Sequence, residues 1–195
     1  MFRLTAAVSF EETIKKSLFI CHAAPVQTAE EALAFFQQHH HADATHNCWA
    51  FKLEQSYRFN DDGEPGGTAG RPILQAIEGQ ELVNTAVLVI RYFGGIKLGT
   101  GGLVRAYGGT AAKCLHQADK TEIIPSKQVV CHALFSEMAM IKARLIQDDV
   151  VVLAEDFTAE GVVWTLSIPT VKVAELEQHY INLTRGKGTW LVQES

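Results

Sequence analysis

The sequence predicts an α+β protein that is divided into two domains. Three observations lead to this class. The last 70 or so residues show strand and helix patterns in the order βαββαβ, which is typical of a split-βαβ, ferredoxin-like domain. The pattern changes at Ile123-Ile124-Pro125. Before that point, an apolar run over residues 85–92 is followed by a glycine-rich segment and then by helical periodicity. We therefore expect domains over residues 1–124 and 126–195.

Composition limits the classes of function. The 195 residues are enough for two cores, and 47% apolar with 20% charged residues is ordinary for a globular protein. The net charge of -5 argues against a general nucleic-acid coat protein, although a local basic patch stays possible. The chain starts without a signal-peptide pattern and has no run of 18 apolar residues, so no membrane contact is expected.

The four cysteines are far apart in sequence and form no CxxC pair. This spacing argues against zinc ribbons and thioredoxin-like motifs. Reduced thiols in a cytoplasmic protein are the simplest interpretation. The sequence predicts neither a bound metal nor a cofactor.

The first domain is expected to begin with strands and a capped helix. Thr28 and Glu31 form a capping box, and Leu33 and Phe36 are expected on the buried face of the helix that follows. Pro72 opens the next helix, because proline suits a first helical turn. The expected elements are strands at 2–10, 17–25, 45–53, 57–60 and 85–92, with helices at 29–41 (ending in the three histidines at 39–41), 73–78 and 103–117.

The second domain is expected to alternate strands and helices, with Ser136 and Thr170 as N-caps. The expected elements are strands at 128–135, 150–157, 161–168 and 189–192, with helices at 136–147 and 170–184. Its central strands offer only Phe135 and Trp164 as aromatic residues. That is short of the stacked set with which such a sheet binds RNA.

Residues 91–109 hold seven of the 15 glycines. They match no nucleotide fingerprint: Val104 stands where a dinucleotide loop needs a small residue, and Thr100 follows Gly99 where a Walker loop needs lysine. Free amides at a helix start, together with nearby basic side chains, can hold a phosphate or carboxylate. Close packing of helix on strand is the alternative. The candidate anion-binding residues are Arg91, Lys97, Gly99, Thr100, Gly101, Gly102 and Arg105.

An acidic loop carries Asp61, Asp62 and Glu64. Three carboxylates this close could bind Mg²⁺ or act as a base. Alternatively, they form a solvated turn, or hydrogen bonds to Arg71 or Arg91 that pin the loop. His46 and Cys48 are two apart, so on a strand they share a face. They could be a nucleophile and its base, but an edge histidine beside a buried cysteine is the more common arrangement.

Three segments together resemble the Impact/YigZ family, in its two-domain bacterial form. They are Ala44–Ala50, Asp61–Pro72 with the pattern DDGEPxGTAGxP, and Arg91–Tyr107 with the pattern RYFGGxxLGxGGLVxAY. The resemblance implies a ribosomal S5 domain 2-like fold for the first domain. It implies a second domain similar to the last domain of elongation factor G. Eukaryotic members regulate translation through an extra N-terminal domain, which the resemblance does not carry over to this chain.

These observations support three hypotheses. The first is a cytoplasmic, non-enzymatic regulator of translation that binds RNA, the ribosome or a translation factor and holds phosphate on the glycine loop. The second is an enzyme that acts on a phosphorylated or carboxylated small molecule. It would use His46, Asp61, Asp62 and Glu64, and it requires the acidic and glycine-rich loops to line one cleft. The third is protein–protein contact through the C-terminal sheet, with both loops serving packing.

Overall fold

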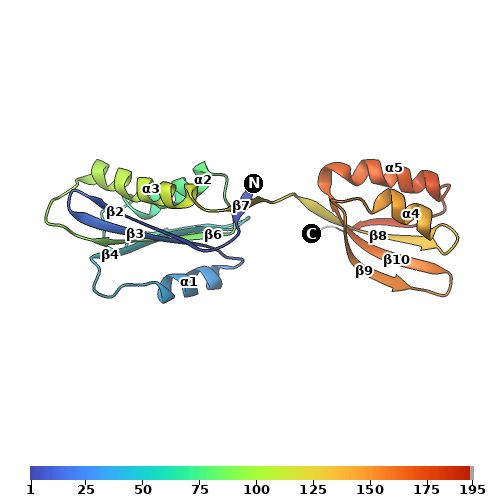
Figure 1. The fold of residues 1–195 in the computed structure, drawn as a ribbon, viewed down its shortest axis with the longest axis horizontal. Helices are drawn as coiled ribbons and strands as arrows, with labels where there is room; N and C mark the ends of the chain where they lie inside the picture. The colour runs from blue at the N-terminus through green and yellow to red at the C-terminus, as the bar shows by residue number, and fades with distance from the viewer. Residues whose placement is uncertain (194–195) are drawn as a thin grey trace. The chain divides into compact units, whose positions relative to one another are not determined.

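The computed structural model describes residues 1–193 and divides into two compact units at Ile123–Ile124. Each unit combines an antiparallel sheet with helices around its own core (Figure 1), which confirms the predicted α+β class. No helix among residues 1–193 is long and apolar enough to cross a membrane.

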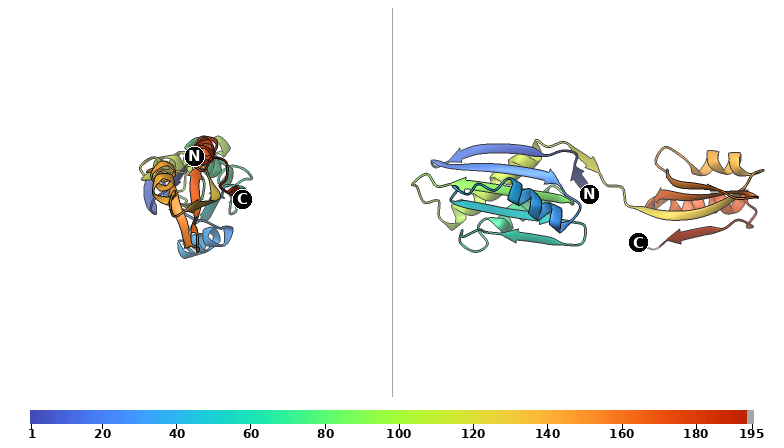
Figure 2. Two further views of the ribbon diagram at one scale, coloured as in Figure 1. Left: turned by 90° about the vertical axis from the view of Figure 1, so that its right-hand side faces the viewer. Right: turned by 90° about the horizontal axis from the view of Figure 1, so that it is seen from below.

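The first unit is built on a five-stranded sheet in the order β2-β3-β6-β4-β5, in which all neighbours are antiparallel. These strands are β2 (Val8–Ile14), β3 (Ser17–Pro25), β4 (His46–Lys52), β5 (Tyr57–Asn60) and β6 (Thr85–Tyr92). Helix α1 (Ala29–Gln38) covers one face, and α2 (Gly70–Gly79) and α3 (Thr100–His116) cover the other (Figures 1 and 2). The central strand β6 is apolar on both faces because both are covered.

The pleat sorts side chains into two cores. Phe19, Cys48 and Val89 pack beneath α2 and α3, whereas Leu88 and Ile90 pack beneath α1. Neighbouring residues of one strand therefore serve opposite faces of the sheet.

The predictions for the first helix are confirmed where they rest on hydrogen bonds between residues close together in the chain. Thr28 Oγ1 accepts from Glu31 N at 3.2 Å, and Glu31 Oε2 accepts from Gln27 N at 2.7 Å, so the capping box is confirmed. The expected burial of Leu33 is wrong: it is 36% exposed. The expected burial of Phe36 is confirmed, and Ala32 is buried with it, since residues four apart lie on one helical face.

Two predicted element boundaries differ in the structure. The expected strand 2–10 is broken in two, because β1 (Phe2–Leu4) pairs with β7 (Lys120–Glu122) outside the main sheet. Helix α2 begins at Gly70, two residues before Pro72.

Gly94 is the clustered glycine with a clear packing role. A Cβ at Gly94 would lie 1.8 Å from the carbonyl oxygen of Lys16, whereas one at Gly108 would make only an ordinary contact, 3.4 Å from Cβ of Pro72 in α2. Glycine at 94 therefore lets the segment after β6 pass against the β2–β3 turn. That turn is formed by Lys15 and Lys16, both at positive φ.

The second unit has a four-stranded sheet in the order β11-β8-β10-β9. Its elements are β8 (Ser126–Leu134), α4 (Met138–Leu145), β9 (Val151–Phe157), β10 (Gly161–Pro169), η1 (Thr170–Lys172), α5 (Val173–Leu183) and β11 (Trp190–Gln193). The helices α4 and α5 pack on one face (Figure 1). Trp164 is fully buried in this core, so it offers no stacking surface.

Both expected N-caps of this unit are wrong. Helix α4 starts after Glu137 rather than Ser136, and Thr170 begins a 3-10 turn that precedes α5. Neither α4 nor α5 has a side-chain cap. Packing of the helices on the sheet sets where they start here, overriding the local cap preference.

Gly94→Ala should destabilise the protein by about 2 kcal/mol or more, because the added methyl collides with backbone atoms. Gly109 in the middle of α3 is the matched control, since a Cβ there would touch nothing within 4 Å. Gly109→Ala should raise stability by up to about 1 kcal/mol. Urea unfolding measures both changes, and equal effects would contradict the packing role of Gly94.

Candidate functional site

The acidic loop and the glycine-rich segment meet in one pocket of about 360 Å³ in the first unit. Strand β4 contributes His46, strand β6 contributes Arg91, and the acidic loop contributes Glu64. The remaining lining residues come from the residue before β4, the two loops and the start of α3: Thr45, Pro65, Phe93, Lys97, Leu98, Gly99, Thr100 and Leu103. The geometric requirement of the small-molecule hypothesis is therefore met.

The pocket rests on a buried ion pair. Arg91 Nη1 donates to Glu64 Oε1 at 2.6 Å, with the two side chains 6% and 4% exposed. Tyr107 of α3 donates its hydroxyl to the same oxygen at 2.7 Å. The Arg91 guanidinium also lies 5.6 Å and 5.5 Å from the ring centres of Phe19 and Phe93. These contacts explain how an arginine can occupy a buried strand, because an unpaired charge there would be very costly.

The pair leaves one buried polar atom without a protein partner. Arg91 Nε is buried and has no hydrogen-bond partner among the described residues. Glu64 Oε2 accepts no hydrogen bond within residues 1–193, since Arg91 and Tyr107 both donate to Oε1, but it is not a buried unpaired atom. Both residues line the pocket. Unsatisfied groups in a cavity indicate that the site can accept a polar ligand.

His46 is oriented by the loop opposite it. Its Nδ1 lies 2.7 Å from the carbonyl oxygen of Asp62. A carbonyl only accepts, so we assign the proton to Nδ1, and the neutral ring then turns the lone pair of Nε2 toward the pocket. Nε2 lies 3.8 Å from Glu64 Oε1. His46 is thereby placed to take up a proton beside a carboxylate that would stabilise the imidazolium.

The other two carboxylates of the acidic loop have structural contacts. Asp61 accepts from the backbone N–H groups of Gly67, Ala69 and Gly70 at 2.8–3.0 Å, and so caps the start of α2. Asp62 accepts from Asn47 N at 2.5 Å. Neither lines the pocket. Of the four residues in the enzyme hypothesis, the structure brings together His46 and Glu64 only.

The start of α3 is open. Its N-cap, Gly99, has φ 72° and no side-chain cap, and space for a side chain there is empty. The first intrahelical bond runs from Leu103 N to Gly99 O, which leaves the amides of Thr100, Gly101 and Gly102 without helical partners.

The predicted basic residues occupy different places. Lys97 is exposed and lines the pocket, whereas Arg105 lines a separate groove with Pro72 and Gly108. Of the seven candidate anion-binding residues, Arg91, Lys97, Gly99 and Thr100 line the pocket.

Two matching family models cover most of the chain. The Impact N-terminal domain matches residues 15–115, and a domain of unknown function (DUF1949) matches residues 131–187. An IMPACT family member from Thermus thermophilus is 45% identical over 80% of this chain and 86% of its own length. IMPACT family member YigZ from Escherichia coli is 37% identical over 93% and 92%. The chain belongs to the IMPACT family.

A solved structure is similar as well. It is described as a crystal structure of a hypothetical protein, is 35% identical, covers 100% of this chain and 97% of its own, and has a TM-score of 0.67. The match to the Impact N-terminal domain includes every pocket residue, so the site lies wholly within the part of the chain that this family model matches.

Cys48 and Tyr107 lie beneath the IMPACT-family pocket. The Cys48 thiol donates to the carbonyl oxygen of Asp61 at 3.0 Å, and burial raises its pKa well above the ordinary value. His46 makes its contacts to Asp62 and Glu64 instead. His46 and Cys48 share a face of β4, but the histidine lines the pocket whereas the cysteine is buried and protonated. Sequence reasoning missed the contact of Tyr107 with Glu64, because its apolar helical spacing indicated a core residue only.

Glu64→Gln should cost about 3 kcal/mol of stability, because it leaves the Arg91 charge buried without its partner. Lys52→Met is the matched control. It breaks the exposed pair with Glu78, whose side chains are 27% and 42% exposed, and should cost less than about 1 kcal/mol. Urea unfolding compares the two, and a cost below that of the control would contradict the central role of the pair.

All four thiols should be inert in the native protein, since all four cysteines are buried. Burial raises the pKa of Cys131 to about 12 and those of Cys21 and Cys48 well above the ordinary value. A thiol reagent at pH 8 should label no cysteine until urea unfolds the chain. A pKa raised in the folded state favours folding below the ordinary thiol pKa of 9.0, and this advantage declines as the pH rises above it. The urea midpoint should therefore fall between pH 8 and about 10. Rapid labelling of Cys48 at pH 8 would instead support a Cys–His dyad.

Proposed function

We propose that the first unit binds a small phosphorylated or carboxylated molecule, and that His46 exchanges a proton with it. One observation carries the proposal. A single pocket joins an oriented histidine, a buried carboxylate, a lysine and the open start of a helix. The anion would lie at the amides that begin at Thr100, with Lys97 beside it.

Size and lining favour a small molecule over a nucleic-acid strand. The volume of about 360 Å³ lies in the range of small-ligand sites. Phe93, Leu98 and Leu103 add apolar walls that would hold a carbon skeleton. Arg91 is neutralised by Glu64, so Lys97 is the lining cation left to bind an anion among the described residues.

The histidine supplies the chemistry. Its Nε2 lone pair faces the pocket, and the Glu64 carboxylate lies 3.8 Å away. A proton removed from the ligand would leave His46 as an imidazolium beside that carboxylate, which lowers the cost of the charge. The reaction class is proton transfer at a group near an anionic substituent.

A role in translation is the second candidate. We propose that the first unit has the ribosomal S5 domain 2-like fold. The second would be ferredoxin-like and similar to the last domain of elongation factor G. The sheet order supports the latter, since the strands of the βαββαβ unit lie in the order fourth, first, third, second. These folds recur in translation proteins, so binding of RNA, the ribosome or a translation factor in the cytoplasm rests on analogy. The pocket would then hold a terminal phosphate.

Calorimetry with inorganic phosphate and pyrophosphate tests the first candidate. Lys97→Ala should weaken binding about tenfold, because it removes a charge-assisted contact. Arg105→Ala is the matched control. It removes the same charge beside the same helix but outside the pocket, so binding should stay within about twofold.

His46→Gln separates binding from proton transfer. The variant should still bind phosphate, whereas the proton uptake that accompanies binding should disappear, because glutamine has no basic ring nitrogen. No binding by the wild-type protein at about 10 mM phosphate would contradict the proposal. Co-sedimentation with ribosomes at low salt, equally weakened in Lys97→Ala and Arg105→Ala, would favour the second candidate.

A further inference from the structure

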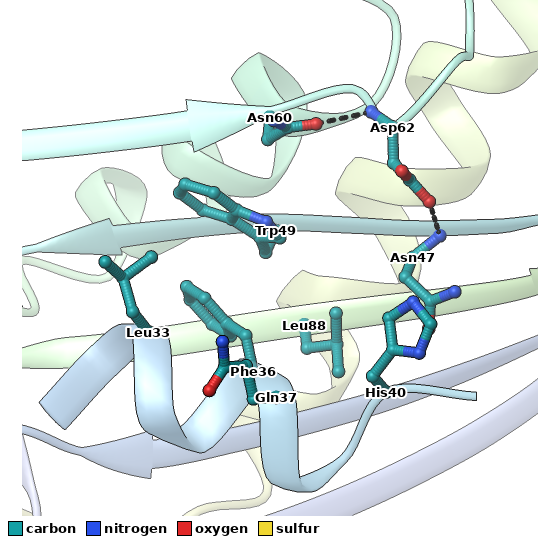
Figure 3. Close-up of a pocket in the computed structure, with 9 residues that line it drawn as sticks. All are labelled: Leu33, Phe36, Gln37, His40, Asn47, Trp49, Asn60, Asp62 and Leu88. Atoms are coloured by element: carbon teal, nitrogen blue, oxygen red, sulfur yellow. Dashed lines mark hydrogen bonds between the residues drawn. The ribbon is translucent and has the colours of Figure 1, made fainter. Parts of the chain in front are cut away.

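A second pocket, of about 470 Å³, lies on the opposite face of the first unit's sheet, between α1, β4 and the end of β5 (Figure 3). None of its lining residues belongs to the anion pocket. It is therefore a separate site, and nothing in the proposed function uses it.

One end of this pocket is aromatic. The Trp49 indole stacks on the Phe36 ring, with ring centres 4.8 Å apart and planes 21° apart. Leu33 and Leu88 complete the apolar lining (Figure 3). Phe36 and Leu88 are buried, so this end is preformed by the core beneath α1. Such a lining favours a flat apolar ring.

The polar end presents fixed groups with free bonding capacity. Asp62 Oδ2 accepts from Asn47 N at 2.5 Å, and Asn60 Oδ1 accepts from Asp62 N at 2.6 Å (Figure 3). Within residues 1–193, the Asn60 amide nitrogen donates no hydrogen bond and Asp62 Oδ1 accepts none, so the first remains available as a donor and the second as an acceptor. The pocket thus offers a donor beside an acceptor, each held in place through its other atom.

The wall behind Asp62 is also fixed. Asn47 is 6% exposed, and its amide bonds both the N–H and the C=O of His41 at 3.0 Å. This double contact ties the segment after α1 to β4. The pocket therefore keeps its shape without a ligand.

Charge decides against an anion here. Asp62 is the one carboxylate in the lining, His40 is the other titratable residue there, and neither lysine nor arginine lines the pocket. A phosphate would face a carboxylate with no lysine or arginine to compensate it. The ligand should be neutral, flat and able to donate a hydrogen bond.

We propose that this pocket binds a nucleobase that carries an exocyclic amino group, as adenine and cytosine do. The amino group would donate to Asp62 Oδ1, the adjacent ring nitrogen would accept from Asn60, and the ring would pack against the aromatic end at Trp49. An amino group next to a ring acceptor distinguishes these bases from hypoxanthine and uracil, which carry a carbonyl in that place.

Four nucleosides test the class. Calorimetry should show adenosine and cytidine binding about tenfold more tightly than inosine and uridine, whose carbonyl oxygens would face the Asp62 carboxylate. Adenosine should also change the emission of Trp49, which is half-buried at the pocket, whereas Trp164 and Trp190 lie in the second unit. A short oligoadenylate distinguishes a base within an RNA strand from a base in a free nucleoside. If the oligoadenylate binds much more tightly than adenosine does, the natural ligand is an RNA strand. Equal affinity indicates a free nucleoside.

Asp62→Asn should abolish the preference. Its carbonyl oxygen can still accept from Asn47 N, and its amide nitrogen would then face the base. Adenosine and cytidine should lose about tenfold, because their amino group would face another donor, whereas the ring N–H of inosine and uridine still faces the Asn60 donor. Asp148→Asn makes the same charge change at an exposed residue of the second unit and should leave the preference unchanged. If Asp62→Asn does not fold, Asn60→Asp is the second test. Asn60 is exposed, and the substitution removes the amide donor to the ring nitrogen, so adenosine binding should weaken here too.

Three results would overturn the proposal. One is no binding of adenosine or cytidine at about 5 mM. Another is equal affinity for all four nucleosides. The third is a preference that neither the Asp62 nor the Asn60 variant changes. Lys97→Ala should leave nucleoside binding intact, so failure of the anion proposal and failure of this one are distinguishable.

Discussion

The buried contact between Glu64 and Arg91 is the constraint on which the first unit depends. Arg91 lies on the central strand between two aromatic rings, and Glu64 comes from the acidic loop. Because neither charge can be left alone in this environment, the loop has to close over the strand. Tyr107 donates to the same oxygen and attaches α3 to the pair. One carboxylate oxygen thus joins a loop, a strand and a helix, and a pocket opens where they meet.

Strand β4 extends this organisation to both faces of the sheet. His46 and Asn47 are neighbours, so the pleat directs them to opposite sides. Asp62 holds both, through its carbonyl oxygen to the His46 ring and through its carboxylate to the backbone of Asn47. Through these contacts, Asp62 of the acidic loop fixes the backbone around β4. The two pockets lie on opposite sides of β4 and have different charged residues: Asp62 lines one, and Glu64, Arg91 and Lys97 line the other.

Glycine has two distinct uses in the segment that follows β6. Gly94 allows backbone to pass within contact of Lys16, which is a packing function. Gly99 adopts positive φ in open space at the head of α3, where no side chain caps the helix. The alternatives of close packing and anion binding thus apply to different glycines. The sequence could not separate them, because a glycine's role depends on what lies opposite it.

The sequence alone determined the α+β class, the strand at residues 85–92, the capping box at Thr28 and the family. These follow from periodicity, local hydrogen bonds and continuous motifs, which involve residues close together in the chain. The tertiary structure decided which polar residues share a pocket. It put His46, Glu64 and Lys97 together, left Arg105 outside and gave Asp61 to the cap of α2. Such contacts depend on strand register and loop closure across long separations, and no local pattern records them.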